Sequence, residues 1–98
     1  MTSKVVVVTG ASDGIGAELA RQLAARDGAA LALVLAARGE DKLAQVGAQC
    51  EAHGTPVLVQ RCDVAQQADC TGLIAAAVAR FGRIDAAARA ALQRETPR

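Results

Sequence analysis

Short runs of apolar residues alternate along the chain with longer segments in which apolar residues recur every three or four positions. Two such runs are residues 4–9 and 30–37, and a third, over residues 57–61, follows Thr55-Pro56. Uninterrupted apolar runs of this length are typical of strands that are buried on both faces of a parallel sheet. The pattern therefore predicts three strands in these ranges.

The segments that follow the three strands have helical spacing. We expect helices over residues 14–26, 41–52 and 65–80, each ending near a glycine, as helices commonly do. Strand and helix alternate with short connections, which favours an α/β fold with parallel strands and right-handed crossovers. Ile15, Leu19, Ala20 and Leu23 recur at helical spacing in the first helix. In the other two helices, the side chains expected to face inward are Leu43, Val46, Cys50, Leu73, Ile74, Ala77 and Val78.

Length and composition limit the chain to a single domain over residues 1–98. The sequence is 52% hydrophobic, but much of this is alanine and Phe81 is the one aromatic residue, so the core is expected to be modest. Residues 83–98 are rich in alanine and are predicted to form a divergent helical tail that continues to Thr96-Pro97.

Charge and cysteine content exclude several classes of function. The formal net charge of +1 gives no support for binding nucleic acid or an anionic membrane. The longest uncharged apolar run, residues 29–37, is too short to span a bilayer. The three cysteines form no CxxC pair and no leader precedes the first strand, so we expect a reduced, cytoplasmic protein with cysteines as small core residues.

A glycine-rich loop, with Gly10, Gly14 and Gly16, follows the first predicted strand and opens the first helix. The first amides of a helix are unpaired and attract phosphate, and glycine lets a pyrophosphate approach the backbone. The Ser12 hydroxyl can add a donor to a phosphate oxygen. The spacing TGxxxGxG differs from GxGxxG, because Leu19 replaces its third glycine, and from a P-loop. The alternative is a tight turn without a ligand.

Two charged residues follow the second and third strands, where ligands bind in open α/β sheets. Arg38 offers a bidentate cation to a 2′-phosphate, which favours NADP over NAD. The alternatives are a solvated arginine or one paired with Glu40 or Asp41. Asp63 can accept a hydrogen bond from an adenine amino group, and it can equally serve as N-cap of the helix that starts near residue 65.

The other titratable residues give weaker signals. His53 is placed at the far end of the second helix, away from the glycine loop, where it is expected to be a surface residue or a cation near the helix C-terminus. Cys50-x2-His53 lacks the second pair of ligands that a zinc site needs, so no metal is predicted. No catalytic residue is assigned.

These residues resemble the short-chain dehydrogenase/reductase family. TGASDGIG at residues 9–16 is similar to its cofactor loop, AAR at 36–38 to an NADP-preferring strand end, and DV at 63–64 to its adenine pocket. FGRID at 81–85 resembles the approach to the family's fourth strand. The resemblance implies a Rossmann-like three-layer fold and hydride transfer between carbonyl and alcohol, with NADP as cofactor and NAD as the alternative. The implied cofactor-binding residues are Gly10, Ser12, Asp13, Gly14, Ile15, Gly16, Arg38, Asp63 and Val64.

The chain departs from the family after residue 85. The family continues with a fourth strand ending in Asn-Asn-Ala-Gly and later supplies a catalytic Ser, Asn and Tyr-xxx-Lys, whereas these 98 residues contain no Tyr and no Asn. Asp13 stands where many NADP-preferring relatives have a basic residue. The resemblance thus implies a truncated oxidoreductase that retains the adenosine and pyrophosphate half and is inactive alone. The alternatives are a stand-alone nucleotide-binding or regulatory module and a purely structural oligomer.

The resemblance also implies the arrangement of the strands. We expect three parallel strands in the order 3-2-1, with the first two helices on one face and the C-terminal helix in place of the fourth strand. The edge of the first strand would then be bare and apolar, a situation that promotes pairing between chains. We therefore expect a dimer or other homo-oligomer formed through this edge or through the open face, and the alternative is a loose, poorly soluble monomer. Neither the substrate nor the oligomeric state follows from the sequence.

Overall fold

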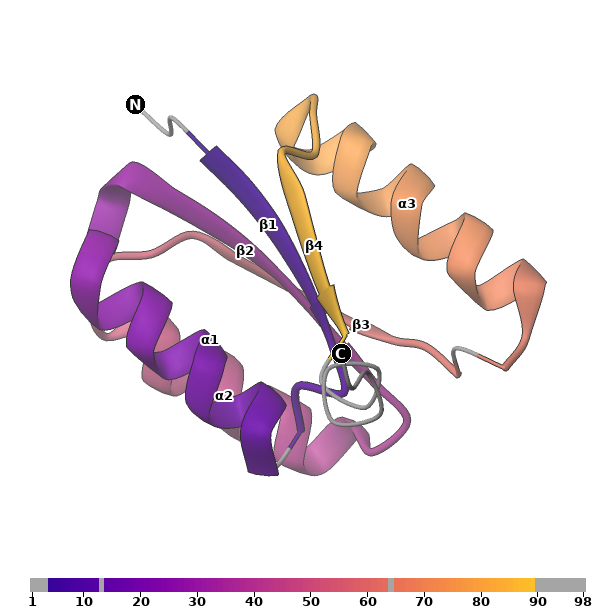
Figure 1. The fold of residues 1–98 in the computed structure, drawn as a ribbon, viewed down its shortest axis with the longest axis horizontal. Coiled ribbons are helices and arrows are strands. Elements are labelled where there is room, and N and C mark those ends of the chain that lie inside the picture. Colours follow the sequence, from indigo (N-terminus) through magenta and orange to yellow (C-terminus); the bar gives the residue numbers. More distant parts are fainter. Residues whose placement is uncertain (1–3, 13, 64, 90–98) are drawn as a thin grey trace, which may run out of the picture.

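The computed structural model describes residues 4–12, 14–63 and 65–89, and Figure 1 shows one parallel sheet between two layers of helices. The three predicted strands and three predicted helices are confirmed within two residues at each boundary, and with them the α/β Rossmann-like fold. The elements in chain order are β1 (Lys4–Thr9), α1 (Gly14–Asp27), the 3-10 turn η1 (Gly28–Ala30), β2 (Leu31–Ala37), α2 (Glu40–Glu51), β3 (Val57–Arg61), α3 (Gln67–Phe81) and β4 (Ala86–Arg89).

The sheet has four parallel strands in the order β3-β2-β1-β4. Thr9 is opposite Ala36, and Ala37 is opposite Arg61, so β1, β2 and β3 end at the same edge of the sheet. The predicted order 3-2-1 is therefore confirmed for the first three strands. It brings the segments that follow these strands together at one edge.

The fourth strand corrects the prediction of a helix in place of it. Residues 86–89 pair in parallel with β1, Val6 opposite Ala86 and Thr9 opposite Arg89, so the edge of β1 is not bare. The helix propensity of alanine is a weak preference that tertiary contacts override, and here the edge of β1 offers a row of unpaired backbone groups. The remainder of the predicted tail, residues 90–98, lies outside the described residues.

Asp85 ties the beginning of β4 to the beginning of β1. Its Oδ2 accepts a hydrogen bond from the Val5 amide at 2.7 Å, and its own amide donates to the Val5 carbonyl at 2.8 Å. Arg83 donates twice to Oδ1, at 3.1 Å from Nε and 2.6 Å from Nη2. The hydrogen bonds from Arg83 and then from the Val5 amide hold the pKa of the Asp85 carboxyl below its usual value.

Replacement of Asp85 by Asn is expected to lower stability at neutral pH. Because the pKa of Asp85 is lowered on folding, the ionised carboxylate stabilises the fold above its unfolded pKa, and this contribution disappears as the pH falls through the folded value. Urea unfolding of both proteins should therefore show a gap at pH 7 that closes at pH values below the ordinary 3.8. Asp41→Asn, which removes an exposed acid, is the control; an equal loss there would contradict the assignment.

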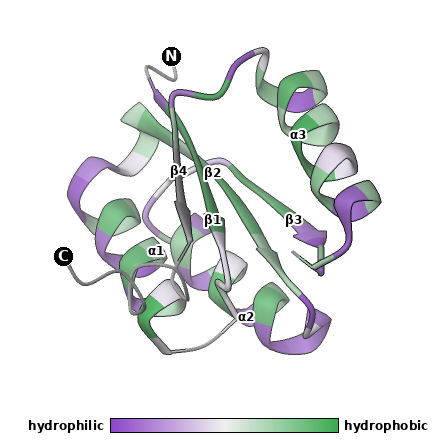
Figure 2. Ribbon diagram, turned by 45° about the vertical axis from the view of Figure 1, so that its right-hand side comes forward, coloured by the Kyte–Doolittle hydropathy of each residue, from purple (hydrophilic) through white to green (hydrophobic). Residues whose placement is uncertain are grey.

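The helices cover the two faces of the sheet unequally. α1 and α2 lie together on one face and α3 on the other (Figure 1), as predicted. The larger cluster of buried residues lies under α1 and α2, and a smaller one lies under α3. Every residue of β2 is buried, and the green central strands of Figure 2 show the apolar layer between the helices. None of the described helices is long and apolar enough to cross a bilayer.

Two of the cysteines lie in the core, whereas part of α3 that was expected there does not. Cys50 and Cys62 are buried, as expected of small core residues, whereas Cys70 is half-buried. Leu73 and Ala77 of α3 face the sheet as predicted, but Ile74 and Val78 are 47% and 45% exposed. The prediction that these two side chains point inward was wrong, because they lie one position further around the helix, on its flank.

Candidate functional site

Each of the three glycines in the loop between β1 and α1 has a structural reason to be glycine. Gly10 and Gly14 have φ values of 70° and 59°, in the left-handed region that favours glycine. Gly16 has no such φ, but a Cβ there would lie 2.1 Å from the Gly10 carbonyl oxygen. The loop is therefore folded tightly against the first turn of α1, and no side chain larger than hydrogen fits at residue 16.

The beginning of α1 is accessible. Gly10 and Gly14 are exposed, Ser12 is half-buried, and Ile15 is 49% exposed despite its size. The first turn of α1 contains no acidic residue that would neutralise the partial positive charge of the helix. A phosphate can therefore approach these amides. The predicted residue Asp13 lies outside the described residues.

Arg38 stands at the same edge of the sheet as the glycine loop. It directly follows β2, whose Ala36 carbonyl accepts a hydrogen bond from the Ala11 amide of the loop at 3.1 Å. The Arg38 side chain is exposed, and no carboxylate of the described residues lies within ion-pairing distance of it. The alternative in which Glu40 or Asp41 pairs with this guanidinium is therefore wrong for the structure.

Asp63 also reaches this edge, because the Cys62 amide donates to the Ala37 carbonyl at 2.9 Å. Asp63 is half-buried, and its Oδ1 accepts a hydrogen bond from the Ala65 amide at 3.0 Å. This bond closes a turn before α3, which begins only at residue 67 with Gln66 as its N-cap. Asp63 is thus not the N-cap, since a short polar side chain favours bonding two residues ahead. The predicted Val64 lies outside the described residues.

A cavity of about 270 Å³ between α1 and α2 adjoins the loop. Ser12 and Gly14 line it from the loop, Arg21 from α1 and Lys42 from the first turn of α2. Lys42 is a candidate phosphate contact that sequence reasoning missed. The available signal was its position four residues after Arg38, one helical turn beyond the end of β2.

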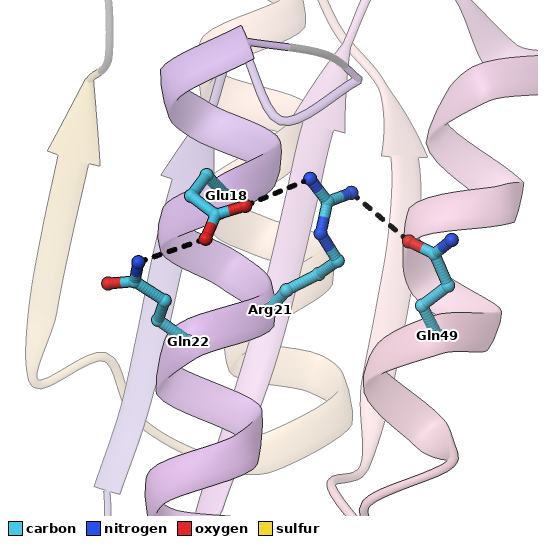
Figure 3. A network of polar contacts seen from close by, with 4 residues as sticks. All are labelled: Glu18, Arg21, Gln22 and Gln49. Carbon is cyan, nitrogen blue, oxygen red and sulfur yellow. Dashed lines mark hydrogen bonds and ion pairs between the residues drawn. The ribbon is translucent and has the colours of Figure 1, made fainter.

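Arg21 is held by a network that joins the two helices (Figure 3). It donates to Glu18 Oε1 at 3.2 Å and to Gln49 Oε1 at 3.1 Å, while Gln22 donates to Glu18 Oε2 at 2.9 Å. The hydrogen bond from Gln22, followed by that from Arg21, lowers the pKa of the Glu18 carboxyl. Because Glu18 neutralises Arg21, this arginine serves to connect α1 and α2 more than to attract an anion.

His53 is not brought into the site. It is exposed in the turn after α2, and its carbonyl oxygen lies 3.2 Å from a Cβ built at Gly28, which follows the last turn of α1. Both residues belong to the end of the molecule opposite the glycine loop. Among the described residues, no group of three or more His, Cys, Asp or Glu side chains is placed to hold a metal ion.

A family model described as short chain dehydrogenase matches residues 4–95, almost the whole chain. The chain belongs to the short chain dehydrogenase family. Its motif-based resemblance to that family is thereby confirmed, and the match continues to residue 95, which corrects the prediction that the chain departs from the family after residue 85. The chain is also similar to the 11-beta-hydroxysteroid dehydrogenase A of Sesamum indicum, with 46% identity over 86 residues, which cover 87% of this chain and 24% of that protein.

Two solved structures have the same fold and bound cofactors. An alcohol dehydrogenase from the archaeon Thermococcus sibiricus, complexed with 5-hydroxy-NADP, has a TM-score of 0.79 and 34% identity, covering 86% of this chain and 35% of that one. An NAD+-bound xylitol dehydrogenase has a TM-score of 0.80 and 29% identity, covering 88% and 32%. This member of the short chain dehydrogenase family thus spans about a quarter to a third of the length of these proteins.

Proposed function

We propose that the chain binds the adenosine and pyrophosphate parts of NADP, in preference to NAD, as the cofactor-binding portion of an oxidoreductase. The observation that carries the proposal is the close approach of Gly16 to the Gly10 carbonyl at an accessible helix start. A side chain at residue 16 would collide with the Gly10 backbone and push the loop away from the helix. Dinucleotide sites of this fold class use such a loop at the carboxyl ends of parallel strands.

Each predicted residue that the structure describes has a proposed role that fits its position. The backbone amides of Gly14, Ile15 and Gly16 and the hydroxyl of Ser12 bind the pyrophosphate, and Gly10 allows its close approach. Arg38 binds the 2′-phosphate, and the half-exposed Ile15 offers an apolar surface beside the loop. Asp63 uses one oxygen for the Ala65 amide, and its second oxygen accepts the adenine amino group. Asp13 and Val64 complete the proposed set.

The chain itself contributes no proton donor of the kind its family uses. Its 98 residues include no Tyr and no Asn, and His53 is far from the glycine loop. Carbonyl reduction needs a group that protonates the developing alkoxide. We therefore expect the isolated 98-residue chain to bind cofactor without catalysing hydride transfer. Carbonyl-dependent NADPH oxidation by the purified chain would contradict this.

Titration with NADP, NAD and 2′,5′-ADP tests the proposed function. We expect NADP and 2′,5′-ADP to raise the melting temperature and NAD to raise it less, because only the first two carry the phosphate that Arg38 binds. A ligand present at a hundred times its Kd adds about 2.7 kcal/mol to the unfolding free energy. Selective binding of either strength would support the proposed nucleotide site. Tight binding would in addition favour a stand-alone nucleotide-binding module, and weak binding a truncated oxidoreductase. No shift with any of the three would refute the proposal.

Self-association is also proposed, but through the α3 face rather than the edge of β1, which β4 occupies. Ile74 and Val78 give α3 an exposed apolar flank that a second copy can bury. Sedimentation should show a dimer, and Ile74→Glu should weaken it about tenfold, because it places a charge in the contact. Ala48→Glu, on the exposed side of α2, is the control. A monomer at all concentrations would refute this contact.

A further inference from the structure

Two of the three cysteines lie together beside the predicted adenine site. Cys62 directly follows β3 and is buried, whereas Cys70 is half-buried in the first turns of α3. Both belong to the cluster under α3, and Cys70 is among the groups that raise the pKa of the neighbouring Cys62 thiol. Cys50 is in the cluster on the opposite face of the sheet. The chain thus contains one close pair of thiols and one isolated thiol.

Neighbouring residues hold the two segments in place. The Asp63 amide donates to Asp69 Oδ2 at 3.0 Å, so the residue after Cys62 is bonded to the residue before Cys70. The Cys62 amide is fixed to the sheet through the Ala37 carbonyl, and the Cys70 amide donates to Gln66 within the start of α3. The hydrogen bond between Asp63 and Asp69 therefore keeps residues 62–63 against residues 69–70, as the formation of a short-range crosslink requires.

We propose that Cys62 and Cys70 form a redox-reactive dithiol that a low-molecular-weight disulfide converts to an intramolecular disulfide. The Cys70 thiol, the more accessible one, loses its proton to water and its thiolate attacks one sulfur of the small disulfide, releasing the other as a thiolate. The Cys62 thiol then loses its proton to water, and its thiolate attacks Cys70 Sγ in the mixed disulfide and releases the second small thiolate. The two small thiolates take up the two protons from water. Two protein thiols are oxidised, and one small disulfide is reduced to two thiols.

The environment of each thiol sets this order of attack. Burial, followed by the neighbouring Cys70, raises the pKa of the Cys62 thiol, so it is a poor first nucleophile in the folded chain. Once Cys70 carries the mixed disulfide, Cys62 has its target sulfur beside it. The loop that closes is only residues 62–70, so little chain entropy opposes closure.

Closing the bond has a consequence for the predicted nucleotide site. The two sulfurs must approach to about 2.05 Å, the length of an S–S bond. Since Cys62 is fixed in the sheet, the movement falls on the start of α3 and on the turn containing Asp63. We therefore expect oxidation to change the affinity for NADP severalfold, an effect that rests on the proposed function, whereas the dithiol itself does not.

The experiment incubates the full chain in mixtures of reduced and oxidised glutathione, then alkylates free thiols under denaturing conditions. Trypsin cleaves after Arg61 and Arg80, so both cysteines lie in one peptide, residues 62–80. We expect this peptide to lose the mass of two hydrogen atoms and to resist alkylation, while Cys50 is alkylated. Cys50→Ser should leave this result unchanged, and Cys70→Ser should abolish it, with circular dichroism confirming that each variant folds.

Three results would count against the proposal. Alkylation of both Cys62 and Cys70 at oxidising ratios that glutathionylate an exposed reference thiol would overturn it, as would a stable glutathione adduct on Cys70 beside a free Cys62. Crosslinked chains on a non-reducing gel, without the internal bond, would also overturn it. An oxidised chain with unchanged NADP affinity would overturn the coupling alone. If NADP does not bind the reduced chain either, the proposed function fails, and the mass result still decides the dithiol.

Discussion

Replacing Gly16 by alanine is expected to destabilise the chain by about 3 kcal/mol and to remove its response to nucleotide. The added Cβ would lie 2.1 Å from the Gly10 carbonyl oxygen and 2.7 Å from its carbonyl carbon. Both are backbone atoms next to the buried Ala11, so no flexible side chain can move to relieve the overlap. The loop must shift away from α1, which disturbs the amides proposed to bind pyrophosphate.

Thermal and urea unfolding with and without NADP measure both effects, and the melting temperature should fall by about 15 °C. Gly72→Ala is the matched control, because nothing lies within 4 Å of a Cβ at that helical position, and it should add about 0.5 kcal/mol of stability. Gly14→Ala tests the backbone requirement without the steric one. A Cβ at residue 14 has no atom within 4 Å, and only the φ of 59° is unfavourable for alanine. If the Gly16→Ala protein is as stable as the wild type and is stabilised equally by NADP, the contact between Gly16 and Gly10 does not shape a nucleotide site.

Replacing Arg38 by Asp is expected to reverse the cofactor preference. The exposed guanidinium has no ion-pair partner among the described residues, so it is available to the 2′-phosphate of NADP. Loss of the charge-assisted contact, with repulsion from the new carboxylate, should weaken NADP binding about 100-fold. NAD lacks this phosphate, and its ribose hydroxyl can donate to Asp, so NAD binding should be unchanged or tighter.

Calorimetric titrations of both nucleotides into both proteins measure the ratio of the two Kd values. Arg80→Asp is the control, because it makes the same change in net charge on α3, on the opposite face of the sheet, where Arg80 lies 5.0 Å from the centre of the Phe81 ring. It should weaken both nucleotides equally and slightly. If Arg38→Asp weakens NADP and NAD to the same degree, Arg38 does not read the 2′-phosphate.

Periodicity predicted β1, β2 and the three helices because their side chains are buried on one or both sides. β2 is the clearest case, since all seven of its residues are buried and its sequence is wholly apolar. β4 was not predicted, because Ala86-Ala-Ala-Arg has the composition of a helix. Its conformation comes from pairing with β1 and from the Asp85 contacts to Val5, neither of which is local in sequence.

Part of the candidate site was also predicted. The glycine spacing predicted the loop. The ends of β2 and β3 predicted that Arg38 and Asp63 lie beside it, because parallel strands end at one edge of the sheet. The turn closed by Asp63 and Ala65 was missed, since a helix N-cap and a preceding turn use the same residue types. The exposure of Ile74 and Val78 was missed because helical spacing predicts the buried stripe but not its width.

The last two peptide carbonyls of β2 have a mechanical consequence. Ala36 accepts from the amide of Ala11 on one side, and Ala37 accepts from the amide of Cys62 on the other. Both flanking loops are thus fastened to a single strand that is buried along its whole length and that itself ends at Arg38. The two loops proposed to contact the nucleotide therefore share one support, and we expect their relative positions to be set by the sheet before any ligand binds.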